Sequence, residues 1–329
     1  MRILFSFFAV IALVLSAYAG VEIANLQFLF GVVIPYAAIA IFILGFIYRV
    51  LKWGNSPVPF RIPTTCGQQN SLPWIKQNKI ENPSSILGVI IRMALEVLIF
   101  RSLFRNLKTQ LQEGKIVYGE AKWLWLAGLA FHWSFLIIFV RHFRFFLQDT
   151  PSFLKAIEGL DSFLQVGVPL LYMTDVVLLG AVTYLFFRRV FIPQVKYISL
   201  AADYFPLFLI FGIAASGVLM RYFYKVHIVG VKELAMGLVS LTPVIPQGIG
   251  VIFYIHLFLI CILLAYFPLS KLMHMGGVFL SPTRNLANNN RAVMHVNPWN
   301  YPVKVHTYAE YEDDFRDKMK AAGLPVEKE

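Results

Sequence analysis

Cysteine is scarce in this chain of 329 residues, which contains only Cys66 and Cys261. The sequence has no C-x-x-C-H motif, so covalently attached c-type haem is excluded. It also has no cysteine cluster that would hold zinc or an iron–sulfur centre. A nucleotide-binding loop and a nucleophile motif are missing too. Any iron–sulfur chemistry must therefore lie on a partner, and the chain itself is not expected to carry out terminal catalysis.

Charge is scarce as well, since 14% of the residues are charged and 58% are hydrophobic. The mean hydropathy is +0.66. A soluble domain of this composition would expose too much apolar surface, so we expect a polytopic protein embedded in the lipid bilayer. The net charge of +11 is then first a topology signal. No basic run is interleaved with aromatic residues, so the sequence predicts no nucleic-acid partner.

Six stretches are long and apolar enough to cross a bilayer. They are residues 3–19, 28–48, 121–146, 163–187, 199–220 and 249–272. The sequence therefore predicts an all-α integral membrane protein with six transmembrane helices. The first stretch also has signal-peptide features, with Arg2 before the apolar run and Ala17-Tyr18-Ala19 near its end. We nevertheless expect it to be retained.

Four segments follow from this pattern. They are two N-terminal transmembrane helices (1–50), a Pro-rich insert (51–120), a four-helix membrane core (121–275) and a C-terminal tail (276–329). Within the insert, residues 84–108 are predicted to be helical. Arg92, Glu96 and Arg101 argue against a seventh span, because charge inside hydrocarbon is costly. We expect an interfacial helix or one packed on a partner. For the tail, docking on a cytoplasmic subunit and a disordered end stay equally open.

The distribution of charge predicts the orientation. Residues 51–120 carry nine Lys and Arg against four Asp and Glu. The positive-inside rule puts such a segment in the cytoplasm. With six spans, the two termini are then cytoplasmic and the loop 147–162 is external. We expect a multi-pass protein of the cytoplasmic membrane.

Four histidines have the most informative spacing in the chain. His132 and His142 lie ten residues apart in one apolar stretch, and His256 and His274 lie eighteen apart in and just beyond another. A helix rises about 1.5 Å per residue, so these gaps are roughly 15 and 27 Å. Each pair places one imidazole in each half of a bilayer. Two metal centres stacked across the membrane are predicted, and bis-histidine haem b is the natural candidate.

Helix direction decides which imidazoles meet at equal depth. The spans predict an outer pair, His142 with His256, and an inner pair, His132 with His274. Ten residues leave roughly 80° between two imidazoles on one helix, so tilt and the bend at Pro268 must absorb a mismatch. A transporter with structural histidines and a non-redox membrane anchor stay open as alternatives.

The same residues carry a family resemblance. The stretch from His256 to His274, HLFLICILLAYFPLSKLMH, resembles the last-helix motif of the gamma subunit of respiratory nitrate reductase. His132 and His142 match the first histidine pair of that family at the same spacing. The tail MGGVFLSPTRNLANNNRAVMHVNPWNYPVKVHTYAEYEDDFRDKMK is similar to that of the DsrM family, the membrane subunits of the sulfite-reduction-associated complex. The likeness runs over essentially the whole chain.

The resemblance implies a cytochrome b with two haem b groups, for which the four matched histidines are the axial ligands. It implies electron exchange with the menaquinone pool, in which menaquinol is oxidised near the outer haem. The reverse direction is chemically equivalent. The implied partner is a cytoplasmic iron–sulfur subunit, DsrK, which resembles the catalytic subunit of heterodisulfide reductase and acts in sulfite and sulfate respiration. Further membrane and extracytoplasmic redox subunits are compatible with this assignment.

An intramembrane carboxylate is a second candidate site. Asp175 lies near the middle of the fourth apolar stretch, where an ionisable residue is a functional candidate by default. It is a candidate for a proton relay or for a hydrogen bond to a ligand imidazole. A neutral, structural carboxyl is the alternative.

Charged residues near the predicted outer haem complete the candidates. Arg141, Arg144 and Arg221 are candidates for haem propionates or quinone, because guanidinium binds carboxylate bidentately. Contact with lipid headgroups is the alternative. Quinol oxidation releases protons, and Asp149 and Lys155 lie within plausible reach of a quinol site.

Overall fold

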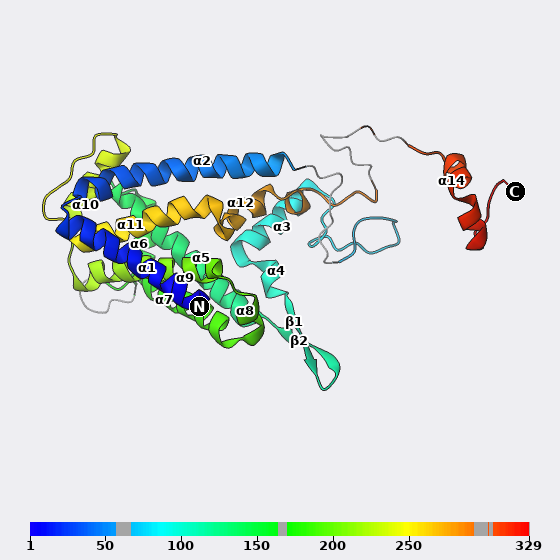
Figure 1. Cartoon of the computed structure of the whole chain (residues 1–329), viewed down its shortest axis with the longest axis horizontal. Helices are drawn as coiled ribbons and strands as arrows, with labels where there is room; N and C mark the ends of the chain where they lie inside the picture. Colours follow the sequence, from blue (N-terminus) through cyan, green and yellow to red (C-terminus); the bar gives the residue numbers. More distant parts are fainter. Residues whose placement is uncertain (57–66, 164–169, 293–301, 303–304, 329) are drawn as a thin grey trace.

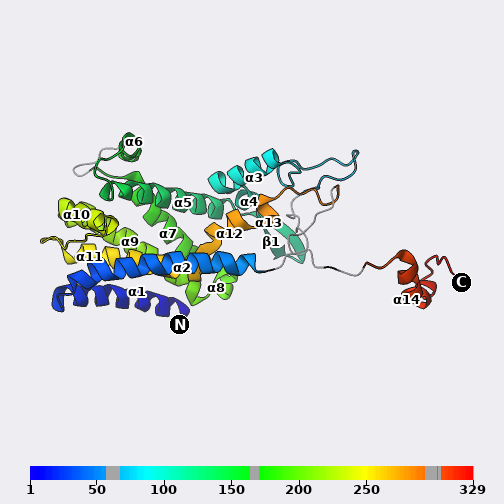
Figure 2. The same cartoon turned by 90° about the horizontal axis from the view of Figure 1, so that it is seen from above.

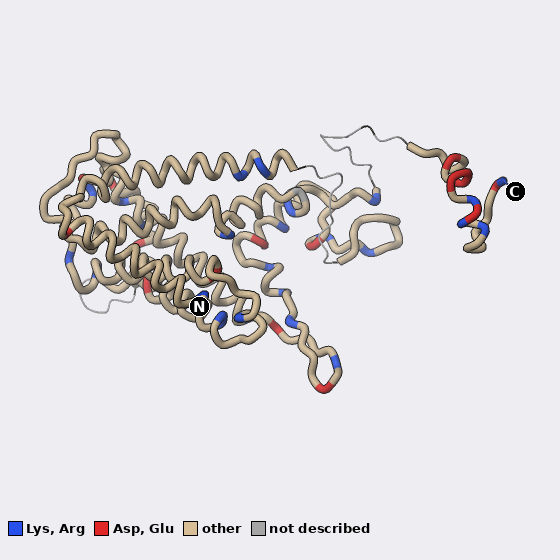
Figure 3. Tube along the Cα trace, viewed as in Figure 1, with Lys and Arg blue, Asp and Glu red and all other residues tan. Residues whose placement is uncertain are grey.

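The computed structural model is an elongated helical bundle (Figures 1 and 2). It describes the whole chain except residues 57–66, 164–169, 293–301, 303–304 and 329. Cys66 lies outside the described residues. Figure 3 shows that Lys, Arg, Asp and Glu are sparse along the bundle helices and more frequent toward their ends, as expected for helices that cross hydrocarbon.

Six helices form the bundle. They are α1 (Arg2–Tyr18), α2 (Ile34–Gly54), α5 (Lys122–His142), α7 (Met173–Phe191), α9 (Ala201–Val218) and α11 (Val251–Tyr266). Short π-helical segments extend α1 (Ala19–Ile23), precede α2 (Leu29–Val33) and extend α9 (Leu219–Phe223), and a 3-10 turn, Phe143–Phe145, follows α5. The bundle also includes two shorter helices at one end, α6 (Ser152–Asp161) and α10 (Ile228–Val239), and α8 (Pro193–Ile198) at the other end.

Five of the predicted spans are long and apolar enough to cross a membrane by themselves. They are Arg2–Ile23, Leu29–Gly54, Lys122–Phe145, Ala201–Phe223 and Val251–Leu269. The sixth prediction, 163–187, corresponds to α7, which carries Asp175 near one end and Arg188 and Arg189 near the other. Because α7 packs between α5 and α9, it belongs to the bundle although it is less apolar. The chain is thus a multi-pass helical membrane protein.

The structure places Asp175 at a different point of its helix from the one predicted. The fourth span begins at Met173 rather than at 163, so Asp175 lies in the first turn of α7 and not near its middle. Asp161 fixes this start, because its carboxylate accepts hydrogen bonds from the backbone N–H of Thr174 (2.8 Å) and from its hydroxyl (2.7 Å). Such a contact satisfies a free N–H group at a helix start.

The insert departs from the prediction of one helix over 84–108. Helix α3 (Ile86–Ile99) ends at Phe100, which has a left-handed φ of 51°, and α4 (Arg101–Phe104) follows in a new direction. Strands β1 (Leu107–Gln112) and β2 (Lys115–Glu120) then form an antiparallel hairpin. The fold is therefore mostly helical rather than wholly α, and the hairpin projects from one end of the bundle (Figure 1).

The charged residues of α3 meet protein. Arg92 is buried and donates to the carbonyl oxygens of Glu81 (3.2 Å) and Thr283 (2.8 Å). Glu96 forms an ion pair of 2.9 Å with Arg284. Burial lowers the pKa of the Arg92 guanidinium. The charged side of α3, which argued against a seventh span, thus packs on the preceding part of the insert and on the start of the tail.

The tail begins in contact with the bundle. Two 3-10 turns, Phe267–Leu269 and Lys271–Met273, connect α11 to α12 (His274–Leu280), and α13 (Pro282–Asn285) lies against α3. The expected tail boundary at 276 therefore falls inside α12. Helix α14 (Tyr308–Ala321) begins with a capping box of Thr307 and Glu310. Figure 1 shows α14 apart from the bundle.

The helices that carry the four histidines do not pack closely on each other. Helix α5 packs on α7, and α11 packs on α9, α1 and α2, whereas α5 and α11, both fully described, are not a closely packed pair. The histidine rings therefore face each other across the space between α5 on one side and α11 and α12 on the other.

Candidate functional site

The inner histidine pair lies between α5 and α12. The ring centroids of His132 and His274 are 6.0 Å apart and nearly perpendicular, at 89°. Phe100, at the end of α3, contacts the His132 ring edge-on, with 4.9 Å between centroids. The insert therefore reaches the inner pair directly.

The outer pair lies between α5 and α11. The ring centroids of His142 and His256 are 6.3 Å apart, and the planes are stacked at 20°. His256 is buried. The histidines that helix direction paired by depth are thus the ones that the structure brings together.

Each of the four rings is oriented through one nitrogen. Nδ1 lies 2.7 Å from the carbonyl of Gly128 in His132 and 2.7 Å from that of Ile138 in His142. In His274, Nδ1 lies 3.0 Å from the carbonyl of Lys271. A carbonyl only accepts, so Nδ1 carries the proton and Nε2 keeps its lone pair. This is the arrangement in which a metal-ligating histidine is fixed by a neighbouring acceptor.

His256 uses a hydroxyl for the same purpose. Its Nδ1 lies 2.9 Å from Oγ of Ser216 on α9, and that hydroxyl lies 2.8 Å from the carbonyl of Gly212. Because the serine proton goes to the carbonyl, the Ser216 oxygen accepts from Nδ1. The next residue, Gly217, has no side chain, and a Cβ there would lie 3.4 Å from Cε1 of His256. Ser216 and Gly217 therefore fit the imidazole of His256 rather than merely a neighbouring helix.

The residues present fit haem b. Two metal–nitrogen bonds of about 2 Å, with half a ring behind each, separate imidazole centroids by roughly 6 Å, as in both pairs. Among the described residues, no group of three or more His, Cys, Asp or Glu gathers as a metal site. The pairs therefore suit a metal that takes two protein ligands and its remaining ligands from a macrocycle. Nε atoms of Arg49, Arg141 and Arg221 are buried without a hydrogen-bond partner in the described part of the chain, and they suit anionic groups of such a macrocycle.

A buried charge cluster adjoins the outer pair. Arg141, which precedes His142, forms ion pairs with Asp161 (3.2 Å) and Asp175 (2.9 Å). Asp175 also accepts a hydrogen bond of 3.0 Å from the hydroxyl of Tyr222. The guanidinium carries one positive charge between two carboxylates. The recorded bonds of Asp175 go to Arg141 and Tyr222 rather than to an imidazole.

The other two arginines differ in their surroundings. Arg144 forms an ion pair of 2.9 Å with Glu158 on α6, and both side chains are partly exposed. Arg221 donates to the carbonyl of Leu170 and lies 3.9 Å from the ring centroid of Tyr172, a ring that Arg141 also contacts at 3.7 Å. Arg141 and Arg221 thus form one group around Tyr172, whereas Arg144 lies apart from it in a partly exposed ion pair.

The remaining candidates are not gathered at the outer pair. Asp149 and Lys155 are exposed, on the loop before α6 and on α6 itself. His227, which is not a predicted ligand, accepts from the backbone N–H of Gly230 at the start of α10. Neither Asp149 nor Lys155 lines the cavity beside the charge cluster.

That cavity, of about 250 Å³, lies between α5, α6 and α7. It is lined by Ile137, Ile157, Leu160, Asp161 and Met173. Four apolar side chains and one carboxylate make a site for a flat apolar molecule with a polar edge.

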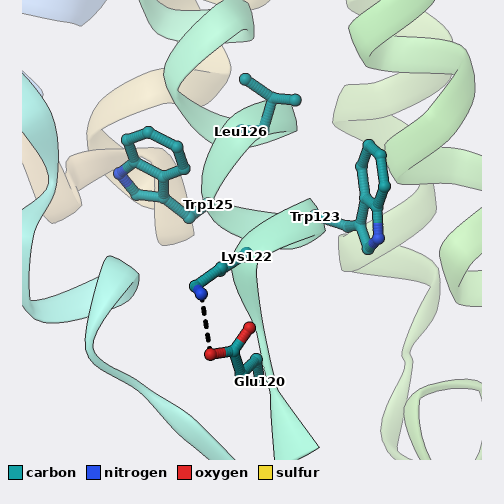
Figure 4. A pocket seen from close by; sticks show the side chains of 5 residues that line it. All are labelled: Glu120, Lys122, Trp123, Trp125 and Leu126. Carbon is teal, nitrogen blue, oxygen red and sulfur yellow. Dashed lines mark ion pairs between the residues drawn. The ribbon is translucent and has the colours of Figure 1, made fainter.

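A larger hollow, of about 410 Å³, surrounds the start of α5 (Figure 4). Trp123 and Trp125 project to different sides of α5, and Lys122 pairs with Glu120 at 2.7 Å. Tryptophan and lysine are typical of the boundary between lipid and water. This hollow contains none of the predicted site residues.

Sequence reasoning missed three contributors to the site: Ser216 as a histidine partner, Asp161 and Tyr222. Ser216 lies forty residues before His256, and Asp161 fourteen before Asp175. Only the packing of α9 on α11 and of α6 on α5 brings them together. A polar residue in an apolar stretch was a usable sequence signal for Ser216, whereas Asp161 offered no such signal.

Comparison with known proteins places the geometry in context. Residues 82–294 match the family model described as nitrate reductase gamma subunit. A protein of Archaeoglobus fulgidus, an "Hdr-like menaquinol oxidoreductase cytochrome b-like subunit", is 45% identical over 278 residues, which cover 82% of this chain and 83% of that protein. A protein of Archaeoglobus profundus with the same description is 42% identical over 274 residues, which cover 81% of each.

Proposed function

Because the chain belongs to the nitrate reductase gamma subunit family, we propose that it is the cytochrome b subunit of a membrane complex that oxidises menaquinol. Its relatives in Archaeoglobus carry that description. The observation that supports the proposal best is the pair of histidine couples, each with its Nδ1 atoms hydrogen-bonded and its Nε2 atoms free to face a metal.

In this proposal, His142 and His256 hold an outer haem b, and His132 and His274 hold an inner one. Haem b, when bound, supplies one-electron transfer. The protein's part is to orient the four imidazoles, exclude water from them and set the distance between the two centres. With ten residues between its histidines, α5 puts the centres about 15 Å apart along the helix.

The quinol site is proposed beside the outer pair, in the cavity of about 250 Å³ that contains Asp161. The apolar lining suits the quinol ring, and its position between helices suits a substrate that arrives through lipid. Quinol oxidation releases two protons, which need acceptors. Arg141 compensates only one of the carboxylates of Asp161 and Asp175, so the cluster is suited to accept a proton. The hydroxyl of Tyr222 extends the path from Asp175.

We propose that electrons leave on the inner side, to a cytoplasmic iron–sulfur protein of the heterodisulfide reductase type. Membership of the DsrM group, with a DsrK-like partner in sulfite respiration, is the specific form of this proposal. Phe100 supports an inner exit, because it connects the insert to His132. Additional membrane and extracytoplasmic subunits would complete the complex.

The orientation belongs to the same proposal. Arg2 and Arg189 both donate to Ser199, and Lys271 pairs with Asp203 at 2.8 Å, so basic residues of several helices gather at one end of the bundle. The positive-inside rule assigns that end to the cytoplasm. Both termini are then cytoplasmic, and the charge cluster of Arg141 faces the outside.

The test is quinol-driven haem reduction in the purified protein, reconstituted in lipid nanodiscs. We expect a menaquinol analogue to reduce the bound haem, and Asp161→Asn to slow this reduction while dithionite still reduces all of the haem. Reduction by dithionite but not by any quinol would contradict the proposal. A preparation without haem would favour a transporter or an anchor.

A further inference from the structure

Arg49 is a cation near the end of a membrane span. It lies in the span Leu29–Gly54, and its Nε is buried with no hydrogen-bond partner among the described residues. Its recorded contact is the ring of Trp53, whose centroid lies 5.9 Å from Cζ. No ion pair of Arg49 occurs in the described part of the chain. The side chain is partly exposed, but a buried guanidinium nitrogen without a hydrogen-bond partner is costly, so an anion from outside the described polypeptide is expected to meet it.

The face of α2 that carries Arg49 is directed at α12. Phe46 and Trp53 lie three residues before and four residues after Arg49, which puts all three on one face of the helix. A Cβ on Gly276 would lie 3.7 Å from the Phe46 ring, and a Cβ on Gly277 would lie 3.8 Å from the Trp53 ring. Arg49 thus lies between two contacts that join α2 to α12.

Helix α12 begins at His274, two residues before the first of these glycines. Arg49 therefore reaches the neighbourhood of the inner histidine pair from a helix that packs on α11. Residues 1–81, which include α2, lie outside the part of the chain that matches the family model. The N-terminal helices consequently bring Arg49 toward the inner histidine pair from outside the matched region.

We propose that Arg49 binds a propionate of the haem held by His132 and His274, an inference that rests on the proposed function. Guanidinium matches a carboxylate with two parallel hydrogen bonds. The added helix α2 then acts as a positioning and tuning element for the inner haem. A lipid phosphate offers similar oxygen acceptors, and the experiment distinguishes the two sources.

The test is a redox titration of the purified haem-loaded protein and its variants, with absorbance as the readout. Arg49→Gln removes the positive charge beside the propionate, which favours the oxidised haem and lowers its midpoint potential. We expect the reduction equilibrium of one haem to shift about tenfold, or about 59 mV for one electron. Arg49→Lys restores part of the shift. Lys52→Gln, an exposed cation on the same helix, is the matched control and leaves both potentials unchanged.

Two double variants identify which haem responds. The shift should persist when Arg49→Gln is combined with His256→Ala, in which the outer haem is lost, and disappear when it is combined with His274→Ala. Unchanged potentials in Arg49→Gln, as for a lipid phosphate partner, would overturn the proposal, and so would a shift of the outer haem. If His256→Ala and His274→Ala do not remove haem at all, the proposed function itself fails.

Discussion

His256 donates a hydrogen bond from Nδ1 to Oγ of Ser216 across 2.9 Å, from α11 to α9. The other three histidines use a carbonyl of their own segment. The outer centre therefore depends on the packing of two helices, and the side chain of Ser216 can be changed without altering the backbone.

Ser216→Ala should retain haem and raise the potential of the outer one. An acceptor on Nδ1 makes the imidazole a stronger donor, which favours ferric iron, so its loss favours the reduced form. A hydrogen bond worth about 1 kcal/mol predicts a shift below the tenfold step of about 59 mV. Potentiometry measures it. Ser134→Ala removes a buried hydroxyl that bonds only to the carbonyls of its own helix, and it should leave both potentials unchanged.

Gly217→Val should abolish the outer haem while the inner one stays. A Cβ alone would lie 3.4 Å from Cε1 of His256, and the branched side chain would displace the ring. Haem content should fall from about two per chain to about one. Gly180 on α7 faces open space, so Gly180→Val should keep both haems. Equal haem contents in the two variants would refute the role given to Gly217.

Arg141→Met should destabilise the protein strongly. It leaves the buried carboxylate of Asp161 and the mostly buried one of Asp175 without their cation, and breaking a buried pair costs about 3–5 kcal/mol. The neighbouring change Arg144→Met removes a partly exposed pair with Glu158, worth below about 1 kcal/mol. Thermal denaturation followed by circular dichroism should show a much larger loss for Arg141→Met. Similar losses would mean that the cluster is not a buried ionic unit.

The tail provides a pH prediction. The backbone N–H groups of Glu327 (2.7 Å) and Lys328 (2.8 Å) donate to the carboxylate of Glu312 and lower its pKa below the usual 4.5. Because the pKa of Glu312 is lower in the folded state, its hydrogen bonds stabilise the folded tail at pH values above the unfolded pKa. This stabilisation is lost as the pH falls through the folded pKa. NMR titration of the Glu312 carboxyl carbon should give a midpoint below 4.5. Truncation after Val326 removes both donors and should raise the midpoint toward that value.

The sequence was sufficient for most of the membrane spans and for the pairing of the histidines, for simple reasons. Apolar runs of more than 18 residues indicate spans, and alternating helix direction determines which histidines share a depth. The two histidine pairs differ in their spacing around the helix axis. This mismatch is accommodated at Pro268, in the first of two 3-10 turns between α11 and α12. His274 is therefore not on a continuous helix with His256.

The parts that the sequence did not reveal depend on contacts between distant segments. The break at Phe100 separates α3 from α4 within a run that looked continuously helical. Asp161 and Asp175 flank a loop, and only the folding of α6 against α5 brings both to Arg141. Phe46 and Trp53 of α2 contact α12 on either side of Arg49, a contact between distant segments that the sequence does not indicate. Tertiary packing, not local propensity, decides each of these.

The central claim is that four histidines hold two haems. A reduced-minus-oxidised spectrum of the purified protein, with haem and protein quantified together, tests it most directly. It should be repeated on His132→Ala, His142→Ala, His256→Ala and His274→Ala. The account predicts about two haems b per chain, and the loss of one in each variant. Absence of haem, or a haem content that none of the four substitutions changes, would contradict it.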